Sequence, residues 1–263
     1  PADIIFRNIL KNKSRNNKDK LESYQYEVYS KLEIDVDEIS EKAKKNRLLK
    51  PFSFVFNNID STSEDKPFLP MFITESISDF YYRKNPKSQR EYIKGSKVSG
   101  IRNESVTQFL GSMYQDVNIY ENFISILGVS FISPINSSGL FFYKYFVIDS
   151  GFIDNKWCYQ LSFKPKRKSE NTFMGDFWVA DTVFAIKKIS MQITKDVNIN
   201  FVEKLSVYQE FTQANDSIWM IKKDKLIIDF ISAGKSPGLI GRKTTTYAKF
   251  NLVNTMIDTA FQQ

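Results

Sequence analysis

The only cysteine of the chain, Cys158, is the first candidate for chemistry, because a thiolate can act as a nucleophile. A nucleophilic cysteine needs a base beside it, and the 263-residue sequence contains no histidine. Strand alternation in KWCYQLSFKP places Cys158 on the face of Gln160 and Ser162, opposite an apolar face. We therefore interpret Cys158 as an inert thiol in a strand. One cysteine and no histidine also rule out an intrachain disulfide and a cysteine-rich zinc site.

Phosphate-binding and carboxylate motifs are incomplete. Residues 233–236, AGKS, resemble the end of a phosphate-binding loop, but Asp229 stands where the first Gly belongs and Pro237 follows where a helix should start. Glu75 and Asp79 are four residues apart in a strand-like segment, which separates them by about 13 Å, too far for a retaining glycosidase pair. We predict no catalytic residue, no cofactor and no metal site.

The charge balance permits an anionic partner. The chain has 37 Lys and Arg against 30 Asp and Glu, a net charge of +7 and a pI near 9.2. One basic cluster lies in a predicted hairpin loop and consists of Lys164, Lys166, Arg167 and Lys168. We predict that this loop contacts anionic lipid headgroups or lipopolysaccharide, with an ordinary lysine-rich surface as the alternative. No nucleic-acid-binding motif accompanies it, so nucleic acid is not the expected partner.

The elements that would position these residues are strands. Apolar and polar residues alternate at period two from Leu140 to Ile193, as in half-buried antiparallel strands. The predicted strands are 140–148, 156–166, 172–180, 183–194, 202–213, 217–222, 225–232 and 243–252. One inward stripe consists of Trp157, Tyr159, Leu161 and Phe163. It faces either a packed core or a lipid-sized apolar groove, and the pattern leaves both open.

The remaining sequence predicts a few helices beside this sheet. We expect a leading helix within residues 1–20, strands and loops over 21–102, a helical segment over 103–127 and the antiparallel sheet over 140–252. The fold class is α+β: a curved, mainly antiparallel sheet with a few helices packed on it, in a single module over residues 1–263. No run of about 20 apolar residues is present to form a transmembrane helix.

Several long stretches carry a family resemblance, namely KPFLPMFITESISDFYYRKNP, ESVTQFLGSMYQDVNIYENF, LFFYKYFVIDSGFIDNKWCYQLSFKPKRK and TFMGDFWVADTVFAIKKI. The chain resembles the Bacteroidota envelope proteins of the domain of unknown function family 5686, over nearly all of residues 1–255. In that family a carboxypeptidase-regulatory-like β-sandwich precedes such a module, and an outer-membrane β-barrel follows it. The resemblance implies a module excised from a longer chain, on the periplasmic side of the outer membrane, and supplies no catalytic residues.

A second likeness is architectural. KWCYQLSFKPKRK followed by FMGDFWVADTVFAIKKISMQI is similar to the strand–loop–strand–turn–strand unit of LolA-like lipoprotein carriers, whose half-barrel holds acyl chains. We therefore expect a non-enzymatic module in envelope assembly or interaction, with a lipid or an extended peptide in an apolar groove. Its expected partners are outer-membrane or periplasmic proteins. The alternatives are a carboxylate-based hydrolase acting on envelope polymers and a purely structural spacer.

Four short motifs fit the same compartment. They are Asp-Ser or Asp-Thr tripeptides that resemble the acceptor motif of Bacteroidota periplasmic O-glycosylation, with Ser61, Thr182, Ser217 and Thr259 as acceptors. Ordinary turn chemistry explains the same residues, because Asp commonly bonds to its own backbone in turns.

Overall fold

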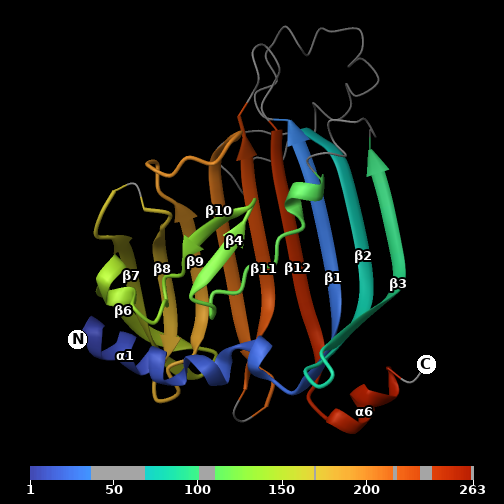
Figure 1. Cartoon of the computed structure of the whole chain (residues 1–263), viewed down its shortest axis with the longest axis horizontal. Helices are drawn as coiled ribbons and strands as arrows, with labels where there is room; N and C mark the ends of the chain where they lie inside the picture. Colours follow the sequence, from blue (N-terminus) through green and yellow to red (C-terminus); the bar gives the residue numbers. More distant parts are fainter. Residues whose placement is uncertain (37–68, 101–109, 169, 216–217, 232–238, 262–263) are drawn as a thin grey trace, which may run out of the picture.

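The computed structural model describes residues 1–36, 69–100, 110–168, 170–215, 218–231 and 239–261. Ten antiparallel strands form one open sheet in the order β3-β2-β1-β12-β11-β10-β9-β8-β7-β6 (Figure 1). Their bounds are β1 (Ser23–Val36), β2 (Leu69–Arg83), β3 (Ser88–Gly100), β6 (Tyr143–Ile153), β7 (Lys156–Pro165), β8 (Phe173–Ala180), β9 (Ile186–Ile193), β10 (Val202–Gln213), β11 (Trp219–Phe230) and β12 (Leu239–Asn251). The first strand, β1, pairs with the last, β12, so two strands that are far apart in the sequence lie side by side within the sheet.

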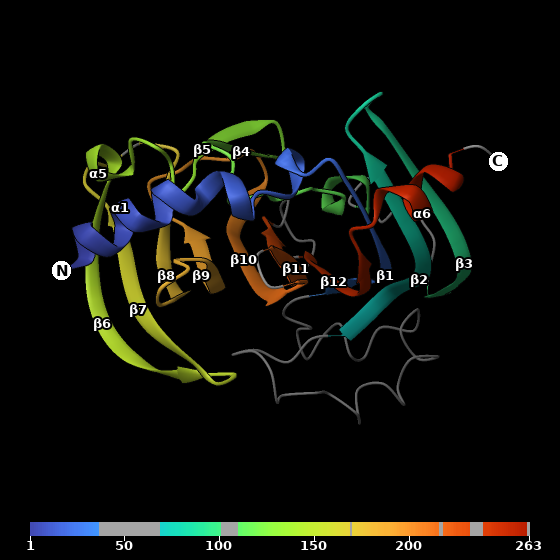
Figure 2. The same ribbon diagram turned by 90° about the horizontal axis from the view of Figure 1, so that it is seen from below.

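Shorter elements cover one face of this curved sheet (Figure 2). Helix α1 (Ala2–Asn12) continues into two 3-10 turns, η1 (Lys13–Asn16) and η2 (Lys18–Lys20), and crosses the concave face of the β6–β10 half. A small hairpin, β4 (Phe123–Ile126) with β5 (Val129–Ile132), lies on the same face. Helix α5 (Gly139–Phe142) lies beside α1, and α6 (Asn254–Thr259) lies against β1 and β2. No helix among the described residues is long and apolar enough to span a membrane.

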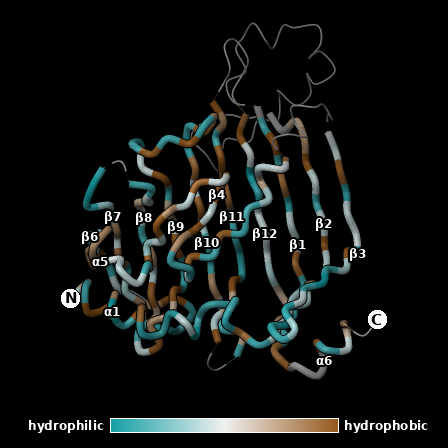
Figure 3. The backbone as a smooth tube through the Cα atoms, in the orientation of Figure 1, coloured by the Kyte–Doolittle hydropathy of each residue, from teal (hydrophilic) through white to brown (hydrophobic). Residues whose placement is uncertain are grey.

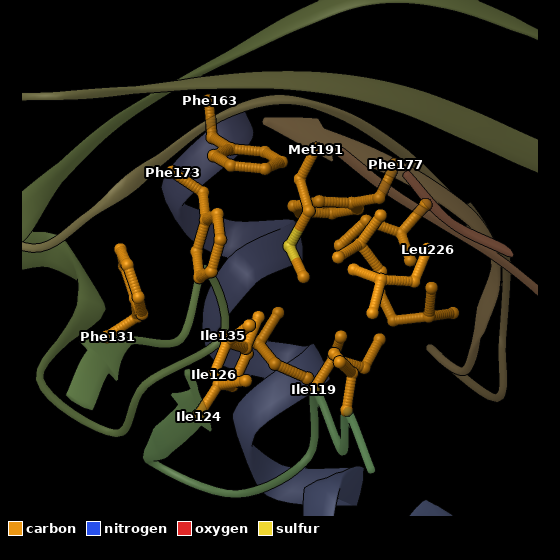
Figure 4. Close-up of a cluster of buried hydrophobic side chains, with 14 of the residues drawn as sticks. Ile119, Ile124, Ile126, Phe131, Ile135, Phe163, Phe173, Phe177, Met191 and Leu226 are labelled. Carbon is orange, nitrogen blue, oxygen red and sulfur yellow. The ribbon is translucent and has the colours of Figure 1, made fainter. Parts of the chain in front are cut away.

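The apolar core fills the space between α1, the β4–β5 hairpin and the sheet (Figure 4). Phe163, Phe173 and Phe177 of the sheet are fully buried against apolar side chains from the covering layer, among them Ile124 and Phe131. Figure 3 shows the alternation of polar and apolar residues along the strands that gives each strand one face for this core. The β6–β10 half of the sheet is therefore solidly packed.

Most of the predicted elements are present. The structure has an open, mainly antiparallel curved sheet with few helices, as the sequence pattern predicts. The leading helix within residues 1–20 is α1, and β1, β2 and β3 lie in the region 21–102 where strands and loops were expected. Two details differ: the strands expected at 217–222 and 225–232 are the single strand β11, and the segment expected to begin a strand at 140 opens with α5.

The helical segment predicted over 103–127 is wrong where the structure describes it. Only residues 110–113 form a helical turn, residues 114–122 are irregular, and residues 123–126 are strand β4; residues 101–109 lie outside the described residues. Side chains compete with helical hydrogen bonds here: the Asn118 amide oxygen accepts from the backbone N–H of Tyr120 at 3.0 Å. Burial of Ile124 and Ile126 with exposure of Phe123 has the period of a strand.

Candidate functional site

A cavity of about 380 Å³ opens on the concave face, in the half of the sheet that α1 leaves uncovered. Pockets that bind small ligands commonly enclose about 300–1,000 Å³. Strands β1, β2, β3, β10, β11 and β12 form its floor and walls, and residues 114–118 with Tyr120 form its rim toward the packed half. The cavity is thus a space that the apolar core does not fill.

The floor of the cavity carries a row of polar side chains that runs across five strands. The strand register aligns them in the order Gln209, Asp224, Thr245, Ser30 and Ser76, from β10 to β2. Neighbouring strands are about 4.8 Å apart, so the row extends roughly 19 Å. Because Ser and Thr side chains are small, this row leaves open space where the corresponding positions of the other half hold Phe and Leu.

An aromatic wall borders the same row. Tyr26 stacks on Phe80 with ring centroids 5.1 Å apart, and Tyr247 meets Tyr26 edge to face at 5.0 Å. All three rings line the cavity, together with the aliphatic Val28. Aromatic rings offer flat apolar surface next to their polar hydroxyl groups. The cavity is therefore amphipathic, with an apolar wall beside a polar floor.

The rim is fixed to the sheet by hydrogen bonds. The Gln209 amide donates to the carbonyl oxygen of Val117 at 2.7 Å, and the Lys243 ammonium donates to the carbonyl oxygen of Gln115 at 3.3 Å. Lys18 pairs with Asp116 at 3.0 Å from both carboxylate oxygens. These contacts hold the 114–118 segment over the floor and keep the cavity open on its other side.

Asp224 is the unusual group of the floor. Its side chain is almost completely buried, and its Oδ1 accepts a hydrogen bond of 2.8 Å from the Gln209 amide. Burial raises the pKa of Asp224 to about 6, against the opposing effects of the Gln209 hydrogen bond and of Lys243. At neutral pH the carboxylate is therefore ionised at an energetic cost, in a position that can accept hydrogen bonds from a ligand.

Replacing Asp224 by Asn is expected to stabilise the fold at neutral pH. The folded carboxyl has a pKa near 6 and the unfolded one about 3.9, so the folded state binds more protons between these values and loses stability as pH rises through them. The Asn variant has no carboxyl at this position, so its stability lacks this dependence on pH. We expect its advantage in free energy of unfolding to grow by about 2 kcal/mol from pH 4 to pH 7.5.

Urea denaturation at the two pH values measures this difference. Asp116→Asn is the control, because its carboxylate is largely exposed and pairs with Lys18, so its loss should change stability by less than about 1 kcal/mol. If the free energy of unfolding changed equally with pH in the wild type and the Asp224 variant, the Asp224 carboxylate would not be ionised at an energetic cost in the folded protein.

The inward stripe predicted on β7 does not line this cavity. Leu161 and Phe163 are fully buried in the packed core, and Tyr159 is half-buried against it. Trp157 was expected to point inward but is 39% exposed, whereas Cys158, expected on the outer face, is buried. Trp157 lies near the β6–β7 turn, where it packs edge to face on Phe152. Alternation does not predict burial there.

The other candidate residues are dispersed. Burial raises the pKa of the Cys158 thiol, which opposes thiolate chemistry. Glu75 and Asp79 lie on β2 outside the cavity, where Glu75 accepts from the Tyr29 hydroxyl and Asp79 pairs with Lys94 at 2.7 Å. The loop at 233–236 lies outside the described residues. Within the described ranges no three His, Cys, Asp or Glu side chains are grouped as metal ligands.

The structure describes two of the four predicted glycosylation acceptors. Thr182 is exposed in the β8–β9 turn and has a positive φ of 72°, and Thr259 is exposed at the end of α6. Ser61 and Ser217 lie outside the described residues. The exposed threonines are accessible to a modifying enzyme.

The four basic residues predicted to contact anionic headgroups, Lys164, Lys166, Arg167 and Lys168, are all exposed at the end of β7. The structure brings two exposed aromatic rings beside them, Phe141 and Phe146, which the sequence did not single out. The cavity residues were missed too, because their alignment needs the pairing of β1 with β12. The one local signal was the small, polar Ser30 within the apolar face of β1.

The sequence profile of a family of unknown function, DUF5686, matches residues 5–247. The chain belongs to this family. No curated protein matches the DUF5686 chain. A DUF1329 family protein from Desulfovibrio piger is similar in fold, with a TM-score of 0.37 and 10% identity, over 95% of this chain and 92% of that one.

Two further solved structures match most of the chain. A putative outer membrane lipoprotein-sorting protein domain from Vibrio parahaemolyticus has a TM-score of 0.33 and 8% identity to the DUF5686 chain, over 98% of this chain and 99% of that one. A LolA superfamily protein from Nitrosomonas europaea has a TM-score of 0.32 and 9% identity, over 94% of this chain and 93% of that one.

Proposed function

We propose that this module is a non-enzymatic binding module that holds an amphipathic ligand, a lipid with one acyl chain, in its concave cavity. The observation that carries the proposal is the open 380 Å³ cavity with an aromatic wall beside a polar floor, in a sheet whose other half is solidly packed. A purely structural spacer gains nothing from leaving such a space unfilled, because buried side chains in contact stabilise a fold.

The cavity lining suits an acyl chain with a polar head. The rings of Tyr26, Phe80 and Tyr247 form the apolar wall for the chain, and burial of apolar surface there is the main driving force. The polar floor supplies acceptors and donors for the head, with Asp224 and Ser76 in one row. An extended peptide is the second candidate, because the same row could bond to its backbone.

Filling the cavity tests this proposal. Ser76→Trp places an indole at the β2 end of the floor, and we expect it to weaken binding of a dansyl-labelled fatty acid by at least about tenfold, equivalent to about 1.4 kcal/mol. The matched control is Ile77→Trp, the next residue of β2, whose side chain points to the opposite, solvent-exposed face. This control should keep its affinity within about twofold.

Three outcomes would decide the ligand class. Saturable probe binding that only Ser76→Trp abolishes supports the lipid. Equal loss in both variants would point to disturbed folding, which thermal unfolding of each variant detects, and probe binding unchanged by Ser76→Trp would contradict the cavity as the site. Native mass spectrometry after purification under mild conditions then identifies a retained lipid or, contrary to the proposal, a retained peptide.

The proposal also includes a cellular setting. We place the module on the periplasmic side of the outer membrane, next to a β-barrel of the same longer protein, where it takes part in envelope assembly with outer-membrane or periplasmic proteins. The family resemblance of the stretches from residue 66 to 189 motivates this placement. Affinity purification of the full-length protein from outer membranes should recover such partners, and its recovery only from the cytosol would contradict the placement.

A further inference from the structure

A compact surface at one end of the β6–β7 hairpin joins exposed aromatic and basic side chains. Phe141 of α5 and Phe146 of β6 are 59% and 42% exposed. The Arg167 guanidinium lies 4.2 Å from the centroid of the Phe141 ring, and the Lys164 ammonium lies 5.0 Å from that of Phe146. We call this surface the basic–aromatic patch, with the members Phe141, Lys144, Phe146, Lys164, Lys166, Arg167 and Lys168.

The patch is held in a defined shape. The backbone N–H of Lys166 donates to the carbonyl oxygen of Phe142 at 2.8 Å, and the Lys166 ammonium donates to that of Leu140 at 2.6 Å. These two bonds fasten the end of β7 to α5. Lys144 and Lys164 are paired in register on neighbouring strands, and both side chains are exposed. The patch is therefore a built surface in which the cations and rings keep their places.

The charge of the patch selects an anionic partner. From residue 139 to 168 the chain has six Lys or Arg residues and two Asp residues. Asp154 pairs with Lys187 at 2.7 Å at the far end of the hairpin, and Asp149 lies between the ends. Glu170 accepts from Arg167 at 2.8 Å and neutralises one cation of the patch. The lysines at 144, 164, 166 and 168 still leave a positive field, which anionic headgroups attract.

The exposed rings select a membrane surface among anionic partners. A soluble anion would engage the cations alone and would leave Phe141 and Phe146 in water. Val147 and Ile148 of β6 are also exposed, on an edge strand paired only with β7. Cations beside exposed Phe are typical of surfaces that lie in the headgroup region, with the rings inserted and the ammonium groups among the phosphates.

We propose that the basic–aromatic patch docks this module on an anionic lipid surface. This surface lies outside the ligand cavity, since none of the patch residues lines it. A membrane-bound edge strand is also protected from pairing with another chain, which is the usual hazard of an exposed apolar edge.

Vesicle co-sedimentation tests the docking. With the whole chain, we expect binding to vesicles of equal parts phosphatidylcholine and phosphatidylglycerol, weakened by salt, and at least tenfold weaker binding to phosphatidylcholine alone. The variant Lys164→Glu/Arg167→Glu should bind anionic vesicles at least tenfold more weakly. Phe141→Ser/Phe146→Ser should bind severalfold more weakly, with more of the remaining binding lost at high salt.

Matched controls change the same charge and apolarity elsewhere. Lys204→Glu/Lys222→Glu alters net charge equally at exposed positions of β10 and β11, and Phe201→Ser removes a ring that is 73% exposed. Both should keep vesicle affinity within about twofold. Equal losses in controls and patch variants, or no binding of the wild type to anionic vesicles, would overturn the proposal. Light scattering that shows a dimer dissociated by Phe141→Ser/Phe146→Ser would overturn it too, in favour of edge pairing between two copies.

Discussion

Replacing Asp35 by Ala is expected to lower the free energy of unfolding by about 3–5 kcal/mol. Asp35 of β1 and Arg242 of β12 form an ion pair of 2.7 Å whose side chains are 0% and 6% exposed. Truncating Asp35 removes this carboxylate from the buried Arg242 guanidinium, and breaking a buried ion pair is far more costly than losing a surface pair. Because β1 and β12 carry the central floor of the cavity, loosening their pairing should also weaken ligand binding.

Urea denaturation with two controls separates the buried charge from simpler effects. Lys31→Ala breaks a pair with Glu33 at 2.7 Å that is partly exposed, and it should cost less than about 1 kcal/mol. The double variant Asp35→Leu/Arg242→Met removes both charges and should recover most of the loss. If Asp35→Ala costs no more than Lys31→Ala, the pair is not desolvated as the structure indicates.

Local pattern predicted the strands well, because alternation is a property of neighbouring residues. The alternation from Leu140 to Ile193 predicted strands where the structure has β6, β7, β8 and β9. The cavity floor could not be found in this way. Thr245 lies beside Ser30 and Asp224 only because the last strand inserts between β1 and β11, and a sequence pattern contains no information on that pairing. Ser30 had no visible role until its neighbours were known.

The errors have physical causes of two kinds. Around Asn118 the local apolar spacing resembles a helix, but polar side chains bond to the backbone and hold the segment as an irregular rim. On β7 the buried residues are Cys158, Leu161 and Phe163, so strict alternation is not kept along the whole strand and Trp157 is exposed. The basic loop was found from composition. Phe146, the ring beside Lys164, was not singled out, because the sequence does not show that β6 is an edge strand of the sheet.

Phe163→Ala is the second change with a large expected effect, a loss of about 3–5 kcal/mol in the free energy of unfolding. The Phe163 ring is fully buried between the rings of Tyr143, edge to face at 5.7 Å, and Phe177, stacked at 5.7 Å. Truncation removes apolar burial and leaves a void, because the surrounding rings come from different strands and cannot all move into it. Chemical denaturation with unchanged m-value measures the loss.

The control for this variant is Phe146→Ala in the neighbouring strand. Phe146 pairs in register with Ser162 and faces away from the core, so its removal should change stability by about 0.5 kcal/mol or less while reducing vesicle binding. The comparison also decides between the two faces that could hold a ligand. If Phe163→Ala cost less than about 1 kcal/mol, the β7 face would be loosely packed and would become a candidate groove. A loss of several kcal/mol would show that the β7 face is packed and would favour the cavity above Asp224 and Ser76 as the site for a lipid.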